Sequence, residues 1–155
     1  MSEAPLHLGR RIAGKYVLEA HVGGGAMGEV YRARHVTLDT KLAIKIMRED
    51  IARNPEFRER FLREARATSR LEHPNSVRVV DFGEEPDGLT YLAMEFLDGR
   101  DLLTVLREDW PLPDARVVDL LAQALSAVSV AHGLGIIHRD LKPENIMVLA
   151  SHDDD

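Results

Sequence analysis

The residues best suited to chemistry lie close together near the C-terminal end of the chain, at positions 138–145. This stretch holds an acid, Asp140, an amine, Lys142, and a carboxamide, Asn145. The spacing suits phosphoryl transfer, in which Asp140 would take the proton of an attacking hydroxyl group and Asn145 would hold a magnesium ion. Such a loop also needs a second carboxylate that binds the metal, and no convincing candidate follows Asn145. The stretch therefore indicates phosphoryl transfer, but it supplies only part of the metal site that this reaction needs.

The composition narrows the classes of protein to consider. The chain has 155 residues and 45% hydrophobic content, which is enough for a real core. With 20 Lys and Arg against 26 Asp and Glu, the net charge of −6 argues against binding to nucleic acid or to an anionic membrane surface. Cysteine is absent, and neither a secretory signal nor an apolar run of about 20 residues is found. We expect a soluble, cytoplasmic chain.

A glycine cluster lies between two segments that read as strands, residues 15–22 and 29–34. Because missing side chains let backbone N–H groups approach phosphate oxygens, the cluster is a candidate phosphate-binding loop. A dinucleotide-binding loop would need a helix directly after the glycines, and here a strand follows. A plain glycine-rich hairpin turn stays open as the alternative. The glycines that fit the G-x-G-x-x-G pattern are Gly23, Gly24, Gly25 and Gly28.

Two charged residues occur at positions where the pattern predicts burial. Lys45 lies in the middle of an apolar strand at 41–47, where an ammonium group is costly to bury without an anionic partner. Glu64 lies in a predicted helix that runs from 55 to about 71, on the same side as several apolar residues. Two charges on inward faces predict an ion pair, although Lys45 on a solvent face remains the alternative. The residues that share the side of Glu64 are Phe57, Phe61, Ala65 and Thr68.

The order of the elements predicts an α+β fold in two parts. The first part would be a five-stranded antiparallel sheet with one helix, and Asp98 and Gly99 mark the change to a helical second part. The strands are expected at 15–22, 29–34, 41–47, 77–82 and 90–96, and the later helices at 101–106 and 114–132.

The helix at 114–132 has a narrow polar stripe on an otherwise apolar cylinder, so it requires cover on most sides. Little of the second part remains to provide this cover. We therefore expect the isolated chain to aggregate or to need a partner chain over this helix. The polar stripe consists of Arg116, Asp119, Gln123, Ser126 and Ser129.

Taken together, these motifs resemble those of eukaryotic-like protein kinases. The resemblance rests on the glycine loop with residues 29–31, on 43–45, Glu64, 73–75 and 138–145. The amino-acid sequences at 25–31 and 140–145 resemble those of bacterial serine/threonine kinases in particular. It implies a tail at 1–14, a small lobe at 15–97, and the beginning of a helical large lobe at 98–155 that stops after the catalytic loop.

The resemblance also implies roles for single residues. Lys45 would hold the α- and β-phosphates of ATP, Glu64 would position Lys45, and Lys142 would neutralise charge on the transferred group. Met94 would be the gatekeeper of the nucleotide site, and Asp101 would contact the ribose. Glu95 and Leu97 would offer backbone groups to adenine, and the adenine slot would be lined by Val22, Val30, Ala43 and Met147.

The expected function is phosphoryl transfer from ATP with Mg²⁺ to Ser or Thr hydroxyl groups of a protein. The family's metal-binding Asp-Phe-Gly lies after the catalytic loop, whereas the only such tripeptide here, 81–83, precedes it within a predicted strand. We interpret 81–83 as a coincidence and the chain as a truncated catalytic domain, whose own activity stays open. The alternative is a noncatalytic nucleotide-binding or interaction module derived from a kinase.

Overall fold

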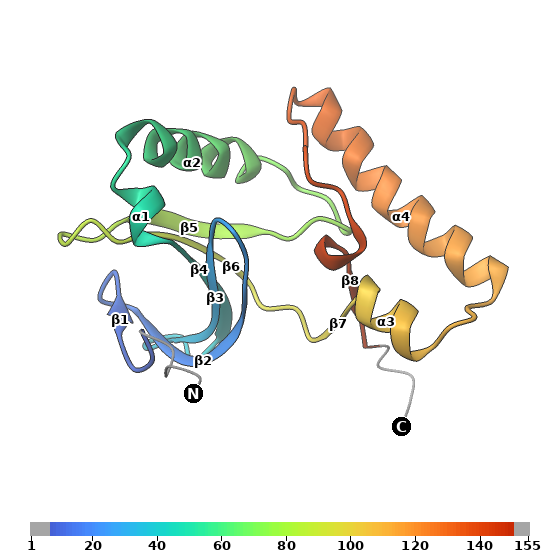
Figure 1. Ribbon diagram of the computed structural model, residues 1–155, viewed down its shortest axis with the longest axis horizontal. Helices are drawn as coiled ribbons and strands as arrows, with labels where there is room; N and C mark the ends of the chain where they lie inside the picture. The colour runs from blue at the N-terminus through green and yellow to red at the C-terminus, as the bar shows by residue number, and fades with distance from the viewer. Residues whose placement is uncertain (1–6, 151–155) are drawn as a thin grey trace. The chain divides into compact units, whose positions relative to one another are not determined.

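The structure is a computed structural model that describes residues 7–150 (Figure 1). The described chain forms two compact units. The first comprises residues 7–70 and 78–96, and the second comprises residues 71–77 and 97–150. The sequence placed a boundary at 97/98, but it did not indicate that 71–77 belongs with the second unit.

The first unit contains an antiparallel sheet of six strands in the order β1-β2-β3-β4-β6-β5. The expected sheet had five strands, because the two residues of β1 are too few to show a period of two. For the same reason the expected tail at 1–14 was wrong at residues 11–12, which form β1. The strands are β1 (Arg11–Ile12), β2 (Tyr16–Gly24), β3 (Gly28–His35), β4 (Lys41–Met47), β5 (Val79–Glu84) and β6 (Thr90–Glu95).

Alternation along the strands places the hydrophobic core on one face of this sheet. Tyr31, Ile44 and Ala93 are opposite one another on β3, β4 and β6, and their exposed fractions are 1%, 0% and 0%. Each large apolar side chain buried in this way contributes about 1.5–3 kcal/mol. The other members of the cluster are Ile12, Tyr16, Leu18, Ala33, Leu42, Ile46 and Tyr91.

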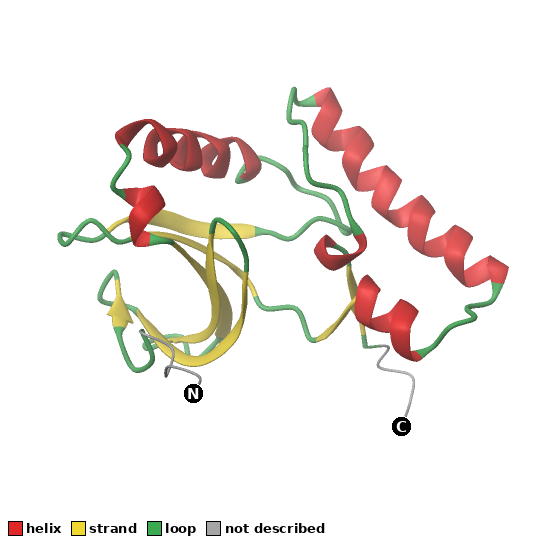
Figure 2. Cartoon of the chain, viewed as in Figure 1, coloured by secondary structure: helices red, strands yellow, loops and turns green. Residues whose placement is uncertain are grey.

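Two helices follow β4, namely α1 (Glu49–Ala52) and α2 (Pro55–Thr68). α2 begins as predicted, because the Asn54 side chain accepts a hydrogen bond from the Glu56 N–H at 3.0 Å and a proline occupies the first helical position. It ends at Thr68 rather than near 71, since the chain from Leu71 on belongs to the second unit. α2 lies along β5 (Figure 2).

Polar contacts join the two edges of the sheet, where β1 and β5 lie at opposite ends of the strand order. They connect residues 10–16 to the hairpin of β5 and β6, so the sheet curls and its edges are held together. The contacts are Arg10 to Asp87 at 2.7 Å, the Ala13 N–H to Glu85 at 2.9 Å, and both Lys15 Nζ and the Tyr16 hydroxyl to Asp81 at 2.9 Å.

Asp81 is the centre of this edge contact. Burial opposes its ionisation, but the hydrogen bonds from Lys15 and Tyr16 outweigh burial and hold the pKa of Asp81 below its ordinary value. Burial and the Asp81 carboxylate together raise the pKa of Tyr16 to about 12, so its hydroxyl remains a donor. The Asp-Phe-Gly tripeptide at 81–83 thus supplies a structural acceptor within β5.

The second unit consists of β7 (Gly99–Asp101), α3 (Leu102–Glu108), α4 (Asp114–Gly133), the short 3-10 helix η1 (Pro143–Asn145) and β8 (Met147–Leu149). β7 and β8 form an antiparallel pair that no sequence pattern predicted, because each has only three residues. None of the helices within 7–150 is long and apolar enough to cross a membrane.

The segment 71–77 packs on the polar stripe of α4. His73 Nε2 lies 3.0 Å from Ser126 Oγ, and the Asn75 amide donates to Gln123 Oε1 at 2.8 Å. The opposite side of α4 is apolar and open, as its pattern indicated. Its large exposed side chains include Val118, Leu121 and Leu125, which are 65%, 50% and 59% exposed.

Replacing Asp81 with Asn should weaken the joined edges of the sheet. Loss of the charged acceptor for Lys15 and Tyr16 is expected to lower the free energy of unfolding by on the order of 1–3 kcal/mol. Because the pKa of Asp81 is lowered on folding, its contribution is fully present above pH 3.8 and is lost as pH falls below that value. Urea unfolding followed by circular dichroism across pH 3–7 measures both effects.

The control is Glu84→Gln, which removes a charge on β5 from the exposed 3.5 Å pair with Arg58. This pair should contribute only about 0–1 kcal/mol. Equal losses in the two variants would contradict the role given to Asp81.

Candidate phosphoryl-transfer site

The face of the sheet opposite the core carries the nucleotide-site residues expected on β3, β4 and β6. The registers place Val30, Lys45 and Leu92 side by side, and Arg32, Ala43 and Met94 side by side in the next row. Each of these side chains is half-buried. The structure therefore brings Val30, Ala43, Lys45 and Met94 onto one surface, which is the arrangement that a flat ligand against the sheet requires. Val22 lies at a bulge of β2 and is 58% exposed.

The glycine cluster forms the turn between β2 and β3, as predicted. The Gly25 N–H donates to the Gly28 carbonyl at 2.9 Å, which closes the turn. Gly28 is buried against β4, and a Cβ atom there would collide with the carbonyl oxygen of Ile46. Gly23 and Gly25 have open space in place of a side chain. The hairpin thus needs glycine at 28 for packing, and at 23 and 25 it presents bare backbone.

The expected ion pair between Lys45 and Glu64 is not formed in the structure. Glu64 binds Arg60 one helical turn earlier at 3.1 Å, and its side chain is 56% exposed. The buried side of α2 is centred on Ala65, with Phe61 partly covered, so Glu64 lies on the flank of that side. The spacing of residues in the sequence did not show whether Glu64 lies at the centre or on the flank of the buried side of α2. Within residues 7–150, Lys45 has no ion pair.

The end of β6 carries the residues expected to meet adenine. The Glu95 N–H donates to the Arg78 carbonyl at 3.0 Å, and Glu95 Oε1 accepts from the Arg78 N–H at 2.7 Å. A contact between Glu95 and a nucleotide would therefore use the Glu95 carbonyl. Leu97, the other residue expected to meet adenine, lies in the second unit, whereas Glu95 lies in the first.

Asp101, which the resemblance assigned to ribose, caps a helix. Its Oδ1 accepts from the Thr104 N–H at 2.9 Å, and its Oδ2 accepts from the Thr104 hydroxyl at 2.7 Å. These hydrogen bonds hold the pKa of Asp101 below its ordinary value. Both carboxylate oxygens thus already have a role at the start of α3, which capping rules indicate for an aspartate at this position.

The catalytic-loop residues do come together in the second unit. The Asn145 amide donates to the Asp140 carbonyl at 2.8 Å and to Asp140 Oδ2 at 3.2 Å, and Lys142 Nζ lies 3.5 Å from the same Oδ2. The Asp140 N–H donates to His138 Nδ1 at 3.3 Å, and Arg139 takes a left-handed backbone conformation with φ 65°. The turn presents Asp140 outward, because its side chain is 67% exposed.

The donor set in this loop fits a divalent cation only in part. Because the Asn145 amide nitrogen is engaged by Asp140, its carboxamide oxygen is the atom left for a metal, and oxygen ligands suit Mg²⁺. No group of three or more His, Asp or Glu side chains within residues 7–150 could hold a metal ion. Further ligands would have to come from nucleotide phosphates or water, as is usual for this cation. Met147 lies on β8 in the same unit and is 38% exposed.

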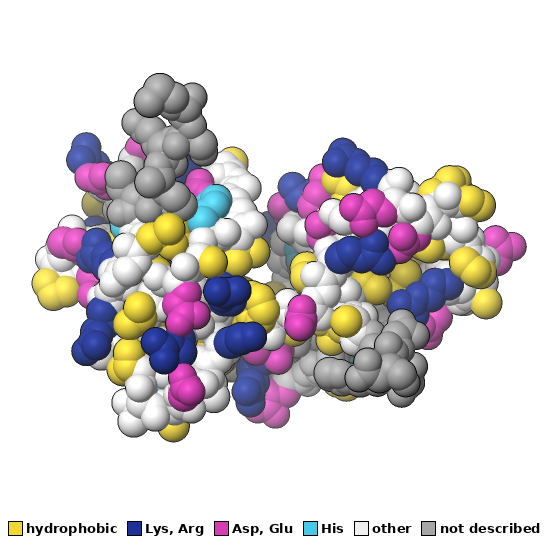
Figure 3. All heavy atoms as spheres, turned by 90° about the horizontal axis from the view of Figure 1, so that it is seen from below, with side chains coloured by type: hydrophobic (Ala, Val, Ile, Leu, Met, Phe, Trp, Pro, Cys, Tyr) yellow, Lys and Arg dark blue, Asp and Glu magenta, His cyan; other side chains and the backbone are white. Residues whose placement is uncertain are grey.

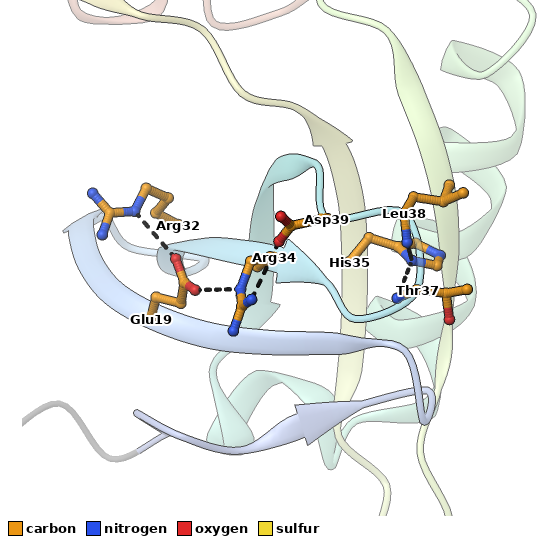
Figure 4. A network of polar contacts seen from close by, with 7 residues as sticks. All are labelled: Glu19, Arg32, Arg34, His35, Thr37, Leu38 and Asp39. Atoms are coloured by element: carbon orange, nitrogen blue, oxygen red, sulfur yellow. Dashed lines mark hydrogen bonds and ion pairs between the residues drawn. The ribbon is translucent and has the colours of Figure 1, made fainter.

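The sequence interpretation missed a charged network at the far end of β3 (Figure 4). Glu19 binds Arg34 at 2.8 Å and lies 3.8 Å from Arg32 Nε, which has no hydrogen bond within the described part of the chain. Arg34 also binds Asp39 at 3.2 Å. Two arginines at i and i+2 in a strand, here Arg32 and Arg34, indicate a shared face and were the available signal. Figure 3 shows basic and acidic side chains interspersed over the visible surface.

The loop at 138–145 brings Asp140, Lys142 and Asn145 into contact. A family model described as the protein kinase domain matches residues 16–154. The chain belongs to the protein kinase family, which confirms the resemblance and the α+β fold expected from it.

Known relatives agree with this assignment. The chain is 51% identical over 142 residues to the serine/threonine-protein kinase pkn3 of Myxococcus xanthus, covering 92% of this chain and 26% of the relative. It is 42% identical over 141 residues to PrkC of Bacillus subtilis, covering 91% and 22%. The crystal structure of the Mycobacterium tuberculosis PknI kinase domain matches with a TM-score of 0.82 and 35% identity, covering 94% of this chain and 58% of that one. The chain thus spans about a quarter of the length of these two curated relatives.

Replacing Gly28 with Ala should distort the hairpin, because the new methyl group would meet the Ile46 carbonyl on the adjacent strand. We expect a loss of about 1–3 kcal/mol in unfolding free energy. Gly25→Ala is the matched control, since nothing lies within 4 Å of a Cβ atom at that position. Similar unfolding midpoints in urea for the two variants would show that the close approach at Gly28 is not constraining.

Proposed function

We propose that this chain provides the ATP-binding sheet and the catalytic loop of a serine/threonine protein kinase. The observation that carries the proposal is the contact of Lys142 and Asn145 with one oxygen of an exposed Asp140. It is supported by the names of the relatives, which are serine/threonine-protein kinases. The whole protein's activity is part of the proposal, because this chain spans only a portion of those relatives.

Asp140 would act as the acceptor of the substrate proton. Lys142 and Asn145 contact its Oδ2, so Oδ1 is the oxygen that remains for a Ser or Thr hydroxyl group. As the hydroxyl oxygen bonds to the γ-phosphorus, its proton passes to Oδ1, and the bond between that phosphorus and the β-γ bridging oxygen breaks to release ADP. Lys142, whose ammonium group is next to the base, would stabilise charge on the group in transfer.

The first unit would bind the nucleotide. Lys45 has no ion pair with another described residue, so its ammonium group is available for α- and β-phosphate oxygens. The bare backbone at Gly23 and Gly25 allows close approach of the phosphates, and Val30 and Ala43 provide an apolar surface for the base. A bound magnesium ion would neutralise phosphate charge during the transfer. Asn145 is the described residue that we assign to it.

The test is magnesium-dependent transfer of labelled phosphate from ATP to a generic protein substrate. It should be run on the 155-residue chain and on the entire gene product that contains it. We expect Asp140→Asn to lower the transfer rate about 10²–10⁴-fold, because a positioned base is lost, while ATP affinity changes little. Lys45→Met should weaken ATP binding and transfer together.

The outcomes separate the two candidate functions. Transfer that survives Asp140→Asn contradicts the assignment of the base. Thermal stabilisation by ATP without transfer by either protein favours a noncatalytic nucleotide-binding module.

The open apolar side of α4 supports a second proposal, that a protein surface covers this helix. Three large aliphatic side chains on one side are at least half exposed, and monomers rarely leave such patches uncovered. The isolated chain should therefore self-associate, and Leu121→Ser with Leu125→Ser should reduce this association. Sedimentation velocity over a concentration series measures it, and a monodisperse wild-type monomer would refute the proposal.

A further inference from the structure

Arg32 is the polar residue in a row of the sheet that is otherwise apolar. On β3 it is opposite Ala20 of β2 and Ala43 of β4. The row continues through Met94 of β6 to Val79 of β5. The two alanine side chains are too short to reach the guanidinium group of Arg32. The row therefore combines an apolar surface with one cation, which is the usual composition of a small-molecule site.

The guanidinium group of Arg32 has hydrogen-bonding capacity that the described chain leaves unused. Its Nε is buried and has no hydrogen-bond partner within residues 7–150. The nearest carboxylate, that of Glu19, is 3.8 Å from Nε and lies closer to Arg34, at 2.8 Å. A buried N–H without a partner costs free energy, so a folded protein that keeps one calls for an explanation.

The terminal nitrogens of Arg32 are the atoms that a ligand could reach. The side chain as a whole is 40% exposed although Nε is buried, so the exposure belongs to its other atoms. Figure 4 shows Nε directed at Glu19 and the two terminal nitrogens on the side of the guanidinium group away from it. The weak ion pair with Glu19 thus orients the guanidinium group and leaves its outer donors free.

The position of the row relates Arg32 to the base and the ribose rather than to the phosphates. Lys45, which is proposed to hold phosphates, lies in the neighbouring row with Val30, about 7 Å away along the strands. A nucleotide with its base on Ala43 and its phosphates at Lys45 brings its nucleoside half within reach of Arg32. A guanidinium group can stack on a purine ring, and its N–H groups can donate to ring nitrogens or ribose oxygens.

We propose that Arg32 is a nucleotide-binding residue whose terminal nitrogens contact the base and ribose of ATP, with Glu19 holding its guanidinium group in place. Arg32 then adds affinity for the nucleoside half, whereas Lys45 adds affinity for the phosphates. The inference rests on the proposed function, because it takes the surface at Val30 and Ala43 as the place of the base.

The first experiment is equilibrium dialysis of the 155-residue chain with labelled ATP, in competition with unlabelled ATP, adenosine or tripolyphosphate, at saturating magnesium and physiological salt. For Arg32→Gln we expect ATP and adenosine to bind about three- to tenfold more weakly, as the loss of one partly exposed guanidinium contact predicts. Tripolyphosphate should bind within about twofold of the wild type, because salt screens the remaining charge effect. Lys45→Met should weaken ATP and tripolyphosphate and leave adenosine unchanged.

Two further variants separate the contact from the charge. Arg34→Gln removes the same charge two residues along the same face of β3, where the guanidinium group already binds Glu19 and Asp39, and it should keep wild-type affinity for adenosine. Arg32→Lys should bind adenosine as weakly as Arg32→Gln, since an ammonium group keeps the charge but lacks the planar face. The proposal is overturned if Arg32→Gln weakens ATP and tripolyphosphate equally, or if Arg32→Lys binds adenosine like the wild type.

Urea unfolding without nucleotide distinguishes a ligand-binding role of Arg32 from a structural one. Arg32→Leu should have an unfolding midpoint at least equal to that of the wild type, because the lost Nε makes no hydrogen bond to a described residue. A lower midpoint would show that Arg32 serves the fold and would count against the proposal.

Failure of the proposed function has a different signature. A wild type that binds neither ATP nor tripolyphosphate contradicts nucleotide binding by the first unit, and the role of Arg32 falls with it. A wild type that binds ATP no more tightly than Arg32→Gln contradicts the role of Arg32 alone.

Discussion

The constraint on which the first unit depends is the period of two along three neighbouring strands. In β3, β4 and β6, one set of alternate residues forms the core, which includes Tyr31, Ile44 and Ala93. The remaining set must then lie on the opposite face, where Val30 and Lys45 are adjacent. A slip of one residue in any strand would exchange the faces, so the cost of exposing the core also fixes the register of the surface that would meet a nucleotide.

Much of this arrangement could be predicted because the signals are local and periodic. β4 was predicted with its observed bounds, and α4 begins where its pattern begins. Local signals fail where an element is short or depends on a distant partner. β7 and β8 have three residues each and exist through pairing with one another, and the segment 71–77 joins the second unit through contacts with α4.

For the candidate site too, the sequence predicted contacts between residues close in the chain better than contacts between distant ones. Asp140, Lys142 and Asn145 lie within six positions, so the chain itself brings them close, and the structure has them in contact. Glu64 was expected beside Lys45 on β4, whereas the structure has it in contact with Arg60 one turn earlier on the same helix. Asp101 shows a further difficulty, since an aspartate before a helix satisfies a capping rule whether or not it also meets a ligand.

The pairing of β7 with β8 has a consequence for the order of events during synthesis. The strand at Gly99–Asp101 leaves the ribosome well before its partner at Met147–Leu149, and α3 and α4 lie between them in sequence. The turn that holds Asp140 ends immediately before β8. The helices can therefore form while the nascent chain is still growing, but the turn that holds Asp140 is anchored only after the last described strand has emerged.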